Sequence, residues 1–120
     1  MSYLLDTNAC IRFLNGTSPA FSKRMGAVDP IGIRISSVTK GELLYGARRS
    51  SRMAENLRML EWFFSWMTSL PFDDRAAEHY GSIRADLASR GRPIGENDLL
   101  IAAIARAQDL TLVTHNTGEF

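Results

Sequence analysis

Three carboxylates, Asp6, Glu42 and Asp98, occupy the same kind of position in the chain. Asp6 ends an apolar run with the pattern of a strand. Glu42 lies in the first turns of the helix expected after the second strand, and Asp98 lies at the start of an apolar helix. Asn116 follows the last expected strand. In a parallel sheet these positions face one edge, beyond the carboxyl ends of the strands, where open α/β sheets bind their ligands. We therefore expect the four side chains to converge.

Carboxylates that lie this close together repel one another, and a hard divalent cation removes the repulsion. Mg²⁺ binds a few carboxylates and keeps several of its waters. It can then activate a water and offset the charge that develops on a phosphodiester. The sequence contains neither a Gly-rich phosphate loop nor a Ser-His-Asp elbow motif. Its one cysteine and two separated histidines match no zinc-ligand spacing. The acids therefore predict a magnesium site.

Each acid also has a purely structural alternative. Asp6 could cap the helix that begins near Ala9. Glu42 fits a capping box with Thr39. Asp98 could complement the dipole of the helix that it starts, which is a common role for a first-turn acid. The functional interpretation therefore depends on the acids as a set, because any one of them alone is a weak signal.

The composition is that of one ordinary globular domain covering residues 1–120. The 120 residues suffice for one core and are too few for two. No apolar run reaches the length that spans a bilayer, and the N-terminus lacks the basic and apolar segments of a signal peptide. The single cysteine, Cys10, cannot form an internal disulfide and fits a reducing compartment. We therefore expect a cytoplasmic protein with no membrane segment.

The net charge of +1 comes from 14 basic and 13 acidic residues, and this balance alone indicates no partner. If the three candidate acids form one cluster, the rest of the surface carries 14 basic residues against 10 acidic ones. A basic surface around an acidic pocket suits a polyanion that must meet a metal there, although the excess is small.

The elements that position these residues are expected to alternate between strands and helices. The expected strands cover residues 3–5, 31–35, 69–72 and 110–114, and the expected helices cover residues 9–14, 20–25, 37–49, 53–67, 74–90 and 97–105. Such alternation predicts an α/β fold with a parallel sheet and right-handed crossovers. The last of these helices is apolar nearly all round, which predicts that it lies buried in the middle of the domain.

Four segments of the chain resemble the PIN-domain family. They are LDTN at residues 5–8, SSVTKGELLYG at 36–46, GRPIGEND at 91–98 and LVTHN at 112–116. Each segment alone is only modestly specific, but the four occur in order over essentially the whole chain. Among PIN domains, the similarity is greatest to the VapC toxins of bacterial type II toxin–antitoxin systems.

The resemblance implies a three-layer α/β/α PIN-like (Rossmann-like) fold with a central, mostly parallel sheet. It also implies a metal-dependent endoribonuclease in which Asp6, Glu42 and Asp98 hold Mg²⁺ or Mn²⁺. A metal-activated water would attack the phosphodiester and leave 5′-phosphate and 3′-hydroxyl ends.

Further residues have supporting roles in this interpretation. Thr7 and Thr114 would orient the acids or a metal-bound water. Many relatives carry an aspartate where this chain has Asn116, whose carbonyl oxygen can bind water or metal but brings no charge. Glu119 is a candidate for the missing acid, so the number of metal ions stays open.

The resemblance further implies three kinds of partner: a cognate VapB-type antitoxin, a second copy of the chain in a homodimer or larger toxin–antitoxin complex, and an RNA substrate. Trp62, Phe63 and Trp66 lie off the apolar stripe of their helix, so they are candidates for an antitoxin groove or, alternatively, for a wide core face. The candidates for contacts with RNA phosphates are the arginines Arg48, Arg49, Arg52, Arg90 and Arg92.

Three other functions are compatible with parts of the pattern. A non-catalytic binding module would use the acids only as caps. A DNA-directed nuclease could have the same fold, since no motif here reads a 2′-hydroxyl. A phosphotransferase with Asp6 as nucleophile is disfavoured, because haloacid-dehalogenase-like enzymes need a second aspartate where this chain has Asn8.

Overall fold

The computed structural model describes residues 2–15, 32–65 and 67–114 of the chain. The expected helix at residues 20–25 lies outside them, as do three candidate side chains, Trp66, Asn116 and Glu119.

The centre of the fold is a four-stranded parallel sheet with the order β3-β2-β1-β4. The strands are β1 (Tyr3–Leu5), β2 (Ile33–Ser36), β3 (Thr68–Leu70) and β4 (Thr111–Val113). Leu5 lies opposite both Ile35 of β2 and Val113 of β4, so the carboxyl ends of these three strands reach the same edge. The predicted parallel sheet is confirmed.

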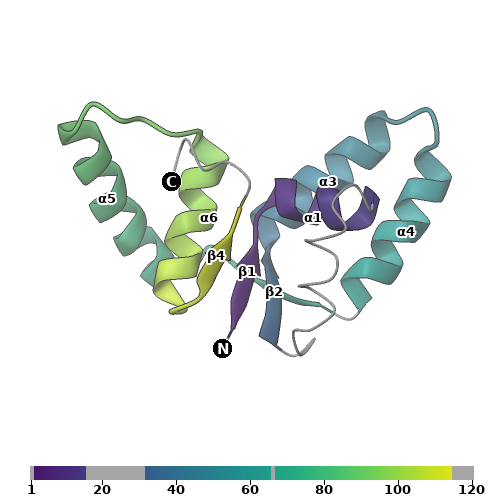
Figure 1. Cartoon of the computed structure of the whole chain (residues 1–120), viewed down its shortest axis with the longest axis horizontal. Coiled ribbons are helices and arrows are strands. Elements are labelled where there is room, and N and C mark those ends of the chain that lie inside the picture. The colour runs from purple at the N-terminus through teal and green to yellow at the C-terminus, as the bar shows by residue number, and fades with distance from the viewer. Residues whose placement is uncertain (1, 16–31, 66, 115–120) are drawn as a thin grey trace.

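Helices cover both faces of the sheet and make the expected three layers. One layer contains α1 (Thr7–Asn15), α3 (Ser37–Arg49) and α4 (Met53–Ser65), and the other contains α5 (Asp74–Ser89) and α6 (Glu96–Ala107). Figure 1 shows the strands between these two groups of helices. Among the described residues, no helix is both long enough and apolar enough to span a bilayer.

The short strand β1 contributes to the core on both faces of the sheet. Leu5 packs with Ile33 and Ile35 against the α1, α3 and α4 layer, whereas Leu4 packs with Ile101 and Ile104 of α6. Successive side chains of a strand point to opposite faces, so a strand covered on both faces needs a continuous apolar run. The apolar run therefore covers the strand and ends at Asp6, the first residue after it.

Side chains cap the N-termini of α3 and α5. The Ser36 hydroxyl accepts a hydrogen bond from the Thr39 backbone N–H at 3.0 Å, and Asp73 Oδ1 accepts one from the Ala76 N–H at 2.9 Å. Such caps satisfy backbone donors that the first turn leaves without a partner. Ser36 is both the last residue of β2 and the cap of α3, so no loop separates that strand from that helix.

The predicted elements lie close to the observed ones, with a few shifts at their ends. Strand β2 begins at Ile33, α4 ends at Ser65 and the edge strand β3 covers Thr68–Leu70. The expected burial of α6 is confirmed, since half of its residues are buried between the sheet and α5: Leu99, Ile101, Ala103, Ile104, Ala105 and Ala107.

Candidate active site

Asp6 is the buried acid at the centre of the candidate site, with a side-chain exposure of 1%. Its Oδ1 accepts a hydrogen bond from the Ala9 backbone N–H at 2.7 Å, so Asp6 does cap α1, as its structural alternative predicts. Its Oδ2 accepts a hydrogen bond from the Thr114 hydroxyl at the end of β4. Helix capping therefore accounts for the hydrogen bond of Oδ1. The hydrogen bond of Oδ2 links Asp6 to the residue that follows β4, near the other end of the chain.

Thr7 and Glu42 connect the start of α1 to α3. The Thr7 hydroxyl donates a hydrogen bond to Glu42 Oε1 at 2.5 Å. The capping-box alternative for Glu42 is wrong, because Ser36 caps α3 and Glu42 lies beyond its first turn. Glu42 is instead held beside the residue that follows Asp6, which agrees with the expected convergence of these two acids.

Two buried hydroxyl groups, Ser36 and Thr39, extend this contact into the protein. Ser36 Oγ lies 3.3 Å from Thr39 Oγ1, which lies 3.4 Å from Thr7 Oγ1. Each hydroxyl has one proton to donate. Because Thr7 gives its proton to Glu42 at the shorter distance, the proton between Thr7 and Thr39 has to come from Thr39, and Ser36 donates in turn to Thr39. The resulting hydroxyl chain orients Thr7 toward the acid.

Sequence reasoning identified Thr7 but missed the parts that Ser36 and Thr39 play. Together with Asp6, they are the buried polar or charged residues among the described parts of the chain. Burying a polar group is costly unless it is hydrogen-bonded. The available signal is a serine directly after an apolar run, followed three residues later by a threonine.

A cleft between α3 and α6, which we call the site cleft, opens beside these groups and has a volume of about 640 Å³. Thr7 and Glu42 line it together with Asn97 and Leu100 from the start of α6. Its other lining residues belong to α3: Ser37, Val38, Gly41 and Tyr45. Asp98, half-buried in the first turn of α6, is the neighbour of Asn97. The structure thus places Glu42 and the first turn of α6 around one cleft.

The donor chemistry fits a hard cation. Asp6 and Glu42 offer carboxylate oxygens, and each such oxygen can accept more than the single hydrogen bond described for it here. However, within residues 2–15, 32–65 and 67–114, no group of three or more His, Cys, Asp or Glu side chains is placed to hold a metal ion. Of the three acids, Glu42 lines the cleft, and Asp6 and Asp98 are the sequence neighbours of two other lining residues, Thr7 and Asn97.

Cys10 lies below Asp6 on α1 and is fully buried. Burial, and secondarily the negative charge of Asp6, raise the pKa of the Cys10 thiol far above its ordinary value. The thiol therefore stays protonated and packs as a small apolar core residue.

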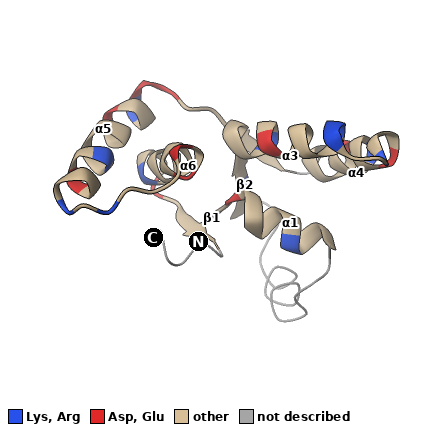
Figure 2. Ribbon diagram, turned by 90° about the horizontal axis from the view of Figure 1, so that it is seen from above, with Lys and Arg blue, Asp and Glu red and all other residues tan. Residues whose placement is uncertain are grey.

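The candidate arginines form two separate groups. Arg48, Arg49 and Arg52 lie around the turn from α3 to α4, and Arg90 and Arg92 follow α5; all five are exposed. Figure 1 shows these two connections on opposite sides of the sheet, and Figure 2 shows basic residues on the helices of both layers. Arg52 pairs with the exposed Glu55 at 2.8 Å and Arg90 with the exposed Asp86 at 3.2 Å. Exposed pairs of this kind contribute little to stability and can exchange partners.

The aromatic residues of α4 divide between core and surface. Phe63 is 0% exposed and packs with Leu60 and with Phe13 of α1, so of its two alternatives the core face is confirmed and the groove is wrong. Trp62 is 58% exposed. A separate groove of about 200 Å³ lies between α1, α3 and α4, and its lining residues include Ile11, Leu14, Leu43, Met59 and Leu60. Glu42 lines both this groove and the site cleft.

Comparison with known proteins identifies the family. The family model described as PIN domain matches residues 3–120. The chain is also 43% identical over 120 residues to the tRNA(fMet)-specific endonuclease VapC of Shigella flexneri, and this match covers 100% of the chain and 90% of the relative. The chain belongs to the VapC ribonucleases of the PIN-domain family.

Solved structures agree with this assignment. This VapC-type chain matches DNA-bound VapBC from Salmonella typhimurium with a TM-score of 0.92 and 38% identity, over 100% of the chain and 90% of its counterpart. It matches VapBC2 from Rickettsia felis, bound to a DNA fragment from the promoter, with a TM-score of 0.91 and 35% identity, over 100% and 91%. The expected PIN-like fold is therefore confirmed.

Proposed function

We propose that this VapC-type PIN domain is an endoribonuclease toxin that hydrolyses RNA phosphodiester bonds and is neutralised by a cognate VapB-type antitoxin. The observation that carries the proposal is the placement of Asp6. It is buried at the carboxyl ends of β1 and β4, held on both oxygens, and followed directly by Thr7, which contacts Glu42 at the site cleft. The name of the Shigella relative, a tRNA(fMet)-specific endonuclease, supports the same chemistry.

The activity depends on Mg²⁺ or Mn²⁺, with Asp6, Glu42 and Asp98 as the residues that would hold the cation. When bound, such a cation activates a water and offsets negative charge on the phosphodiester. The role of the chain is to hold its carboxylates in place: the Ala9 N–H and the Thr114 hydroxyl hold Asp6, and the Thr7 hydroxyl holds Glu42. Carboxylates whose orientation is set before the substrate arrives need no reorganisation during the reaction. Asn116 or Glu119 would complete the set of ligands.

The antitoxin would lie in the apolar groove between α1, α3 and α4. Ile11 and Met59 are exposed there, and a segment in this groove would reach Glu42, which also lines the site cleft. Occupation of the groove would therefore bring the antitoxin to a catalytic side chain, which explains how binding could stop the reaction. The solved VapBC complexes support such a partner. The same proposal includes three further points. The chain is a single PIN-like domain, it forms a homodimer, and it acts in the cytoplasm.

Incubation of the purified chain with total RNA, followed by mapping of the cleaved ends, tests the activity. We expect cleavage with Mg²⁺ or Mn²⁺, no cleavage with EDTA, and 5′-phosphate and 3′-hydroxyl ends. Asp6→Ala and Asp98→Ala should abolish cleavage, whereas Asp74→Ala on the exposed first turn of α5 should not. Cleavage that persists in EDTA or in both site variants would contradict the proposal. Cutting of DNA but not RNA of the same sequence would indicate a DNA-directed nuclease instead.

A further inference from the structure

Tyr45 is a large aromatic side chain on the wall of the site cleft, and the proposed chemistry gives it no role. It lies on α3 three residues after Glu42, and residues at this spacing lie on the same face of a helix. Its side chain is 62% exposed, although it lines the cleft together with Thr7, Glu42 and Asn97. A ring at this position therefore contributes little to the core and faces whatever enters the cleft.

The surroundings of Tyr45 are open, and one cation contacts its ring. Gly41 lies on the same wall, and a Cβ atom added there would meet nothing within 4 Å. The Arg49 guanidinium lies over the Tyr45 ring, with its central carbon 5.4 Å from the ring centroid, and donates a hydrogen bond to the Tyr45 hydroxyl at 3.3 Å. The guanidinium can cover only one face of the ring, and it places a positive charge beside the cleft.

We propose that Tyr45 is the stacking platform for a nucleobase of the RNA strand next to the bond that is cut. This inference rests on the proposed ribonuclease function, because it assumes that the RNA enters the cleft that contains Glu42. Single-stranded RNA is bound largely by stacking its bases on aromatic side chains, since every base has a π-face. Arg49, held against the ring, supplies a charge for the adjoining phosphate.

The dimensions and polar groups of the cleft fit this ligand. The volume of the cleft, about 640 Å³, lies within the range of sites that hold drug-sized ligands. A single nucleotide is a ligand of that size class. Asn97 on the α6 side carries an amide that can both donate and accept hydrogen bonds, as the edge of a base requires. The ring on one wall and the amide on the other are the two kinds of contact that single-strand recognition uses.

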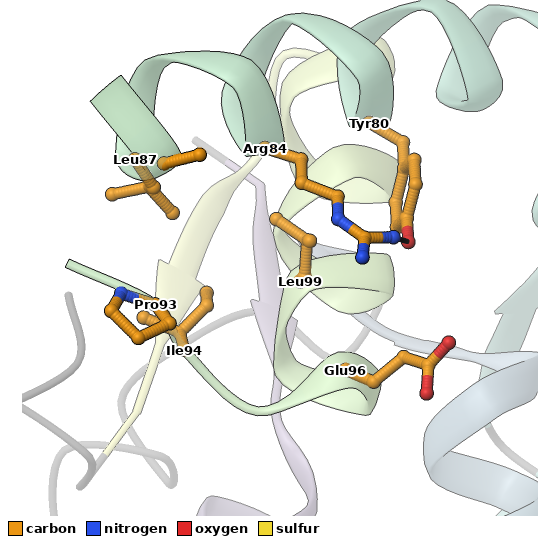
Figure 3. Close-up of a pocket in the computed structure, with 8 residues that line it drawn as sticks. Tyr80, Arg84, Leu87, Pro93, Ile94, Glu96 and Leu99 are labelled. Carbon is orange, nitrogen blue, oxygen red and sulfur yellow. Dashed lines mark hydrogen bonds between the residues drawn. The ribbon is translucent and has the colours of Figure 1, made fainter. Parts of the chain in front are cut away.

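The protein contains a matched pair of residues for comparison. On α5, Arg84 donates a hydrogen bond to the Tyr80 hydroxyl at 2.7 Å, and its guanidinium carbon lies 5.8 Å from the Tyr80 ring centroid. This pair lines a different hollow of about 340 Å³, which we call the α5–α6 pocket and which Figure 3 shows. The pair repeats the i, i+4 geometry of Tyr45 and Arg49 away from Thr7 and Glu42, so Tyr80 variants are the natural control.

The test measures RNA binding separately from cleavage. The variants are Tyr45→Ala, Tyr45→Leu, Tyr45→Phe and the control Tyr80→Ala. The probe is a short single-stranded RNA of mixed sequence with a 5′-fluorescein label, followed by fluorescence anisotropy in a buffer containing EDTA, which prevents metal-dependent cleavage. We expect Tyr45→Ala and Tyr45→Leu to bind about 5- to 100-fold more weakly than the unsubstituted protein. Tyr45→Phe should keep most of the affinity because it keeps the ring, and Tyr80→Ala should bind normally.

A second measurement locates the stacked base. Abasic nucleotides are placed one at a time around the mapped cleavage site, and the affinity of the unsubstituted protein should fall at one position. On the RNA that is abasic at that position, Tyr45→Ala should bind nearly as well as the unsubstituted protein does. The base that the ring would stack on is already missing from this RNA, so removing the ring costs little more. In cleavage assays with Mg²⁺, Tyr45→Ala should raise KM more than it lowers kcat.

The outcomes separate this inference from the proposed function. The inference is overturned if Tyr45→Ala binds the probe as tightly as the unsubstituted protein does, if Tyr80→Ala loses as much affinity, or if the unsubstituted protein does not bind the probe. In each of these cases the proposed ribonuclease function still holds if the unsubstituted protein cleaves RNA and Asp6→Ala does not. Conversely, ring-dependent binding without any cleavage would support the platform and contradict the ribonuclease.

Discussion

The site cleft and the α5–α6 pocket both border the first turns of α6, and each is lined by a tyrosine that contacts an arginine four residues later on the same helix. Their remaining residues differ. The site cleft is lined by Thr7 and Glu42, which contact each other. Thr7 directly follows the buried Asp6 in sequence and contacts the buried Thr39, which contacts the buried Ser36. In the α5–α6 pocket the described acid is Glu96, which is exposed, and the lining is otherwise largely apolar (Figure 3).

The difference follows from where each hollow lies relative to the sheet. The site cleft lies where β1 and β2 end and α1 and α3 begin, so side chains from separate parts of the chain meet at one edge. The α5–α6 pocket lies between two helices that pack side by side, and its residues come from those helices and the segment that joins them. An aromatic–arginine pair on a helix surface is therefore not enough to indicate a site. The buried polar groups at the strand ends make the distinction.

The largest expected effect is at Asp6. Asp6→Asn keeps an oxygen that can cap α1 but removes the charge, so we expect a loss of more than about 100-fold in kcat/KM with little change in fold. Asp74→Asn, the matched substitution on the α5 side, should keep full activity. The measurement is RNA cleavage with Mg²⁺ together with thermal unfolding of each variant. Equal activity of the two variants would remove the functional distinction between the two regions.

Thr7→Val should have the next largest effect. It removes the hydroxyl that holds Glu42 while keeping the volume of the side chain, and we expect about a 10- to 100-fold loss in kcat/KM, as is usual when a residue that orients a ligand is lost. Thr7→Ser should restore most of the activity, and steady-state kinetics at several Mg²⁺ concentrations would show whether the loss includes weaker activation by the metal. Full activity of Thr7→Val would mean that the contact with Glu42 is incidental.

Thr39→Val tests the buried end of the hydroxyl chain. The substitution leaves the Ser36 and Thr7 hydroxyls with one partner fewer in a buried region, and this should lower the free energy of unfolding by about 1–3 kcal/mol. Thr39→Ser keeps the hydroxyl and loses only a methyl group, so its free energy of unfolding should be closer to that of the unsubstituted protein. Chemical denaturation measures the difference. An unchanged free energy of unfolding in Thr39→Val would show that the chain of hydroxyls carries no stability.

The smallest effects concern the side-chain caps of α3 and α5. Ser36→Ala and Asp73→Ala should each lower the free energy of unfolding by about 1 kcal/mol, because each removes a partner from a first-turn N–H. Only Ser36→Ala should also slow RNA cleavage, since Ser36 donates to Thr39 while Asp73 caps a helix of the other layer. If both variants lost cleavage to the same extent, the loss would reflect stability and not the site.

Local sequence determined most of the elements of this protein. The apolar run that stops at Asp6, the alternation of strands and helices and the nearly uniform apolar character of α6 each predicted a feature that the structure confirms. These features depend on residues that are close in sequence, such as the continuous apolar run of a strand covered on both faces, so the sequence alone contains them. The positions of the acids in the sequence and the resemblance to PIN domains both indicated Asp6, Glu42 and Asp98 as the candidate site residues.

Only the tertiary structure decided which polar groups meet and which aromatic rings are buried. Thr114 donates to Asp6 across 108 residues of sequence, and Thr7 contacts Glu42 across 35. Neither pairing could be derived from local patterns. The helical pattern of α4 gave its apolar stripe but not the width of the face that the sheet covers, so Phe63 and Trp62 looked alike in sequence although one is buried and the other exposed. Burial and long-range hydrogen bonds depend on how separate elements pack, and that packing is a property of the whole chain.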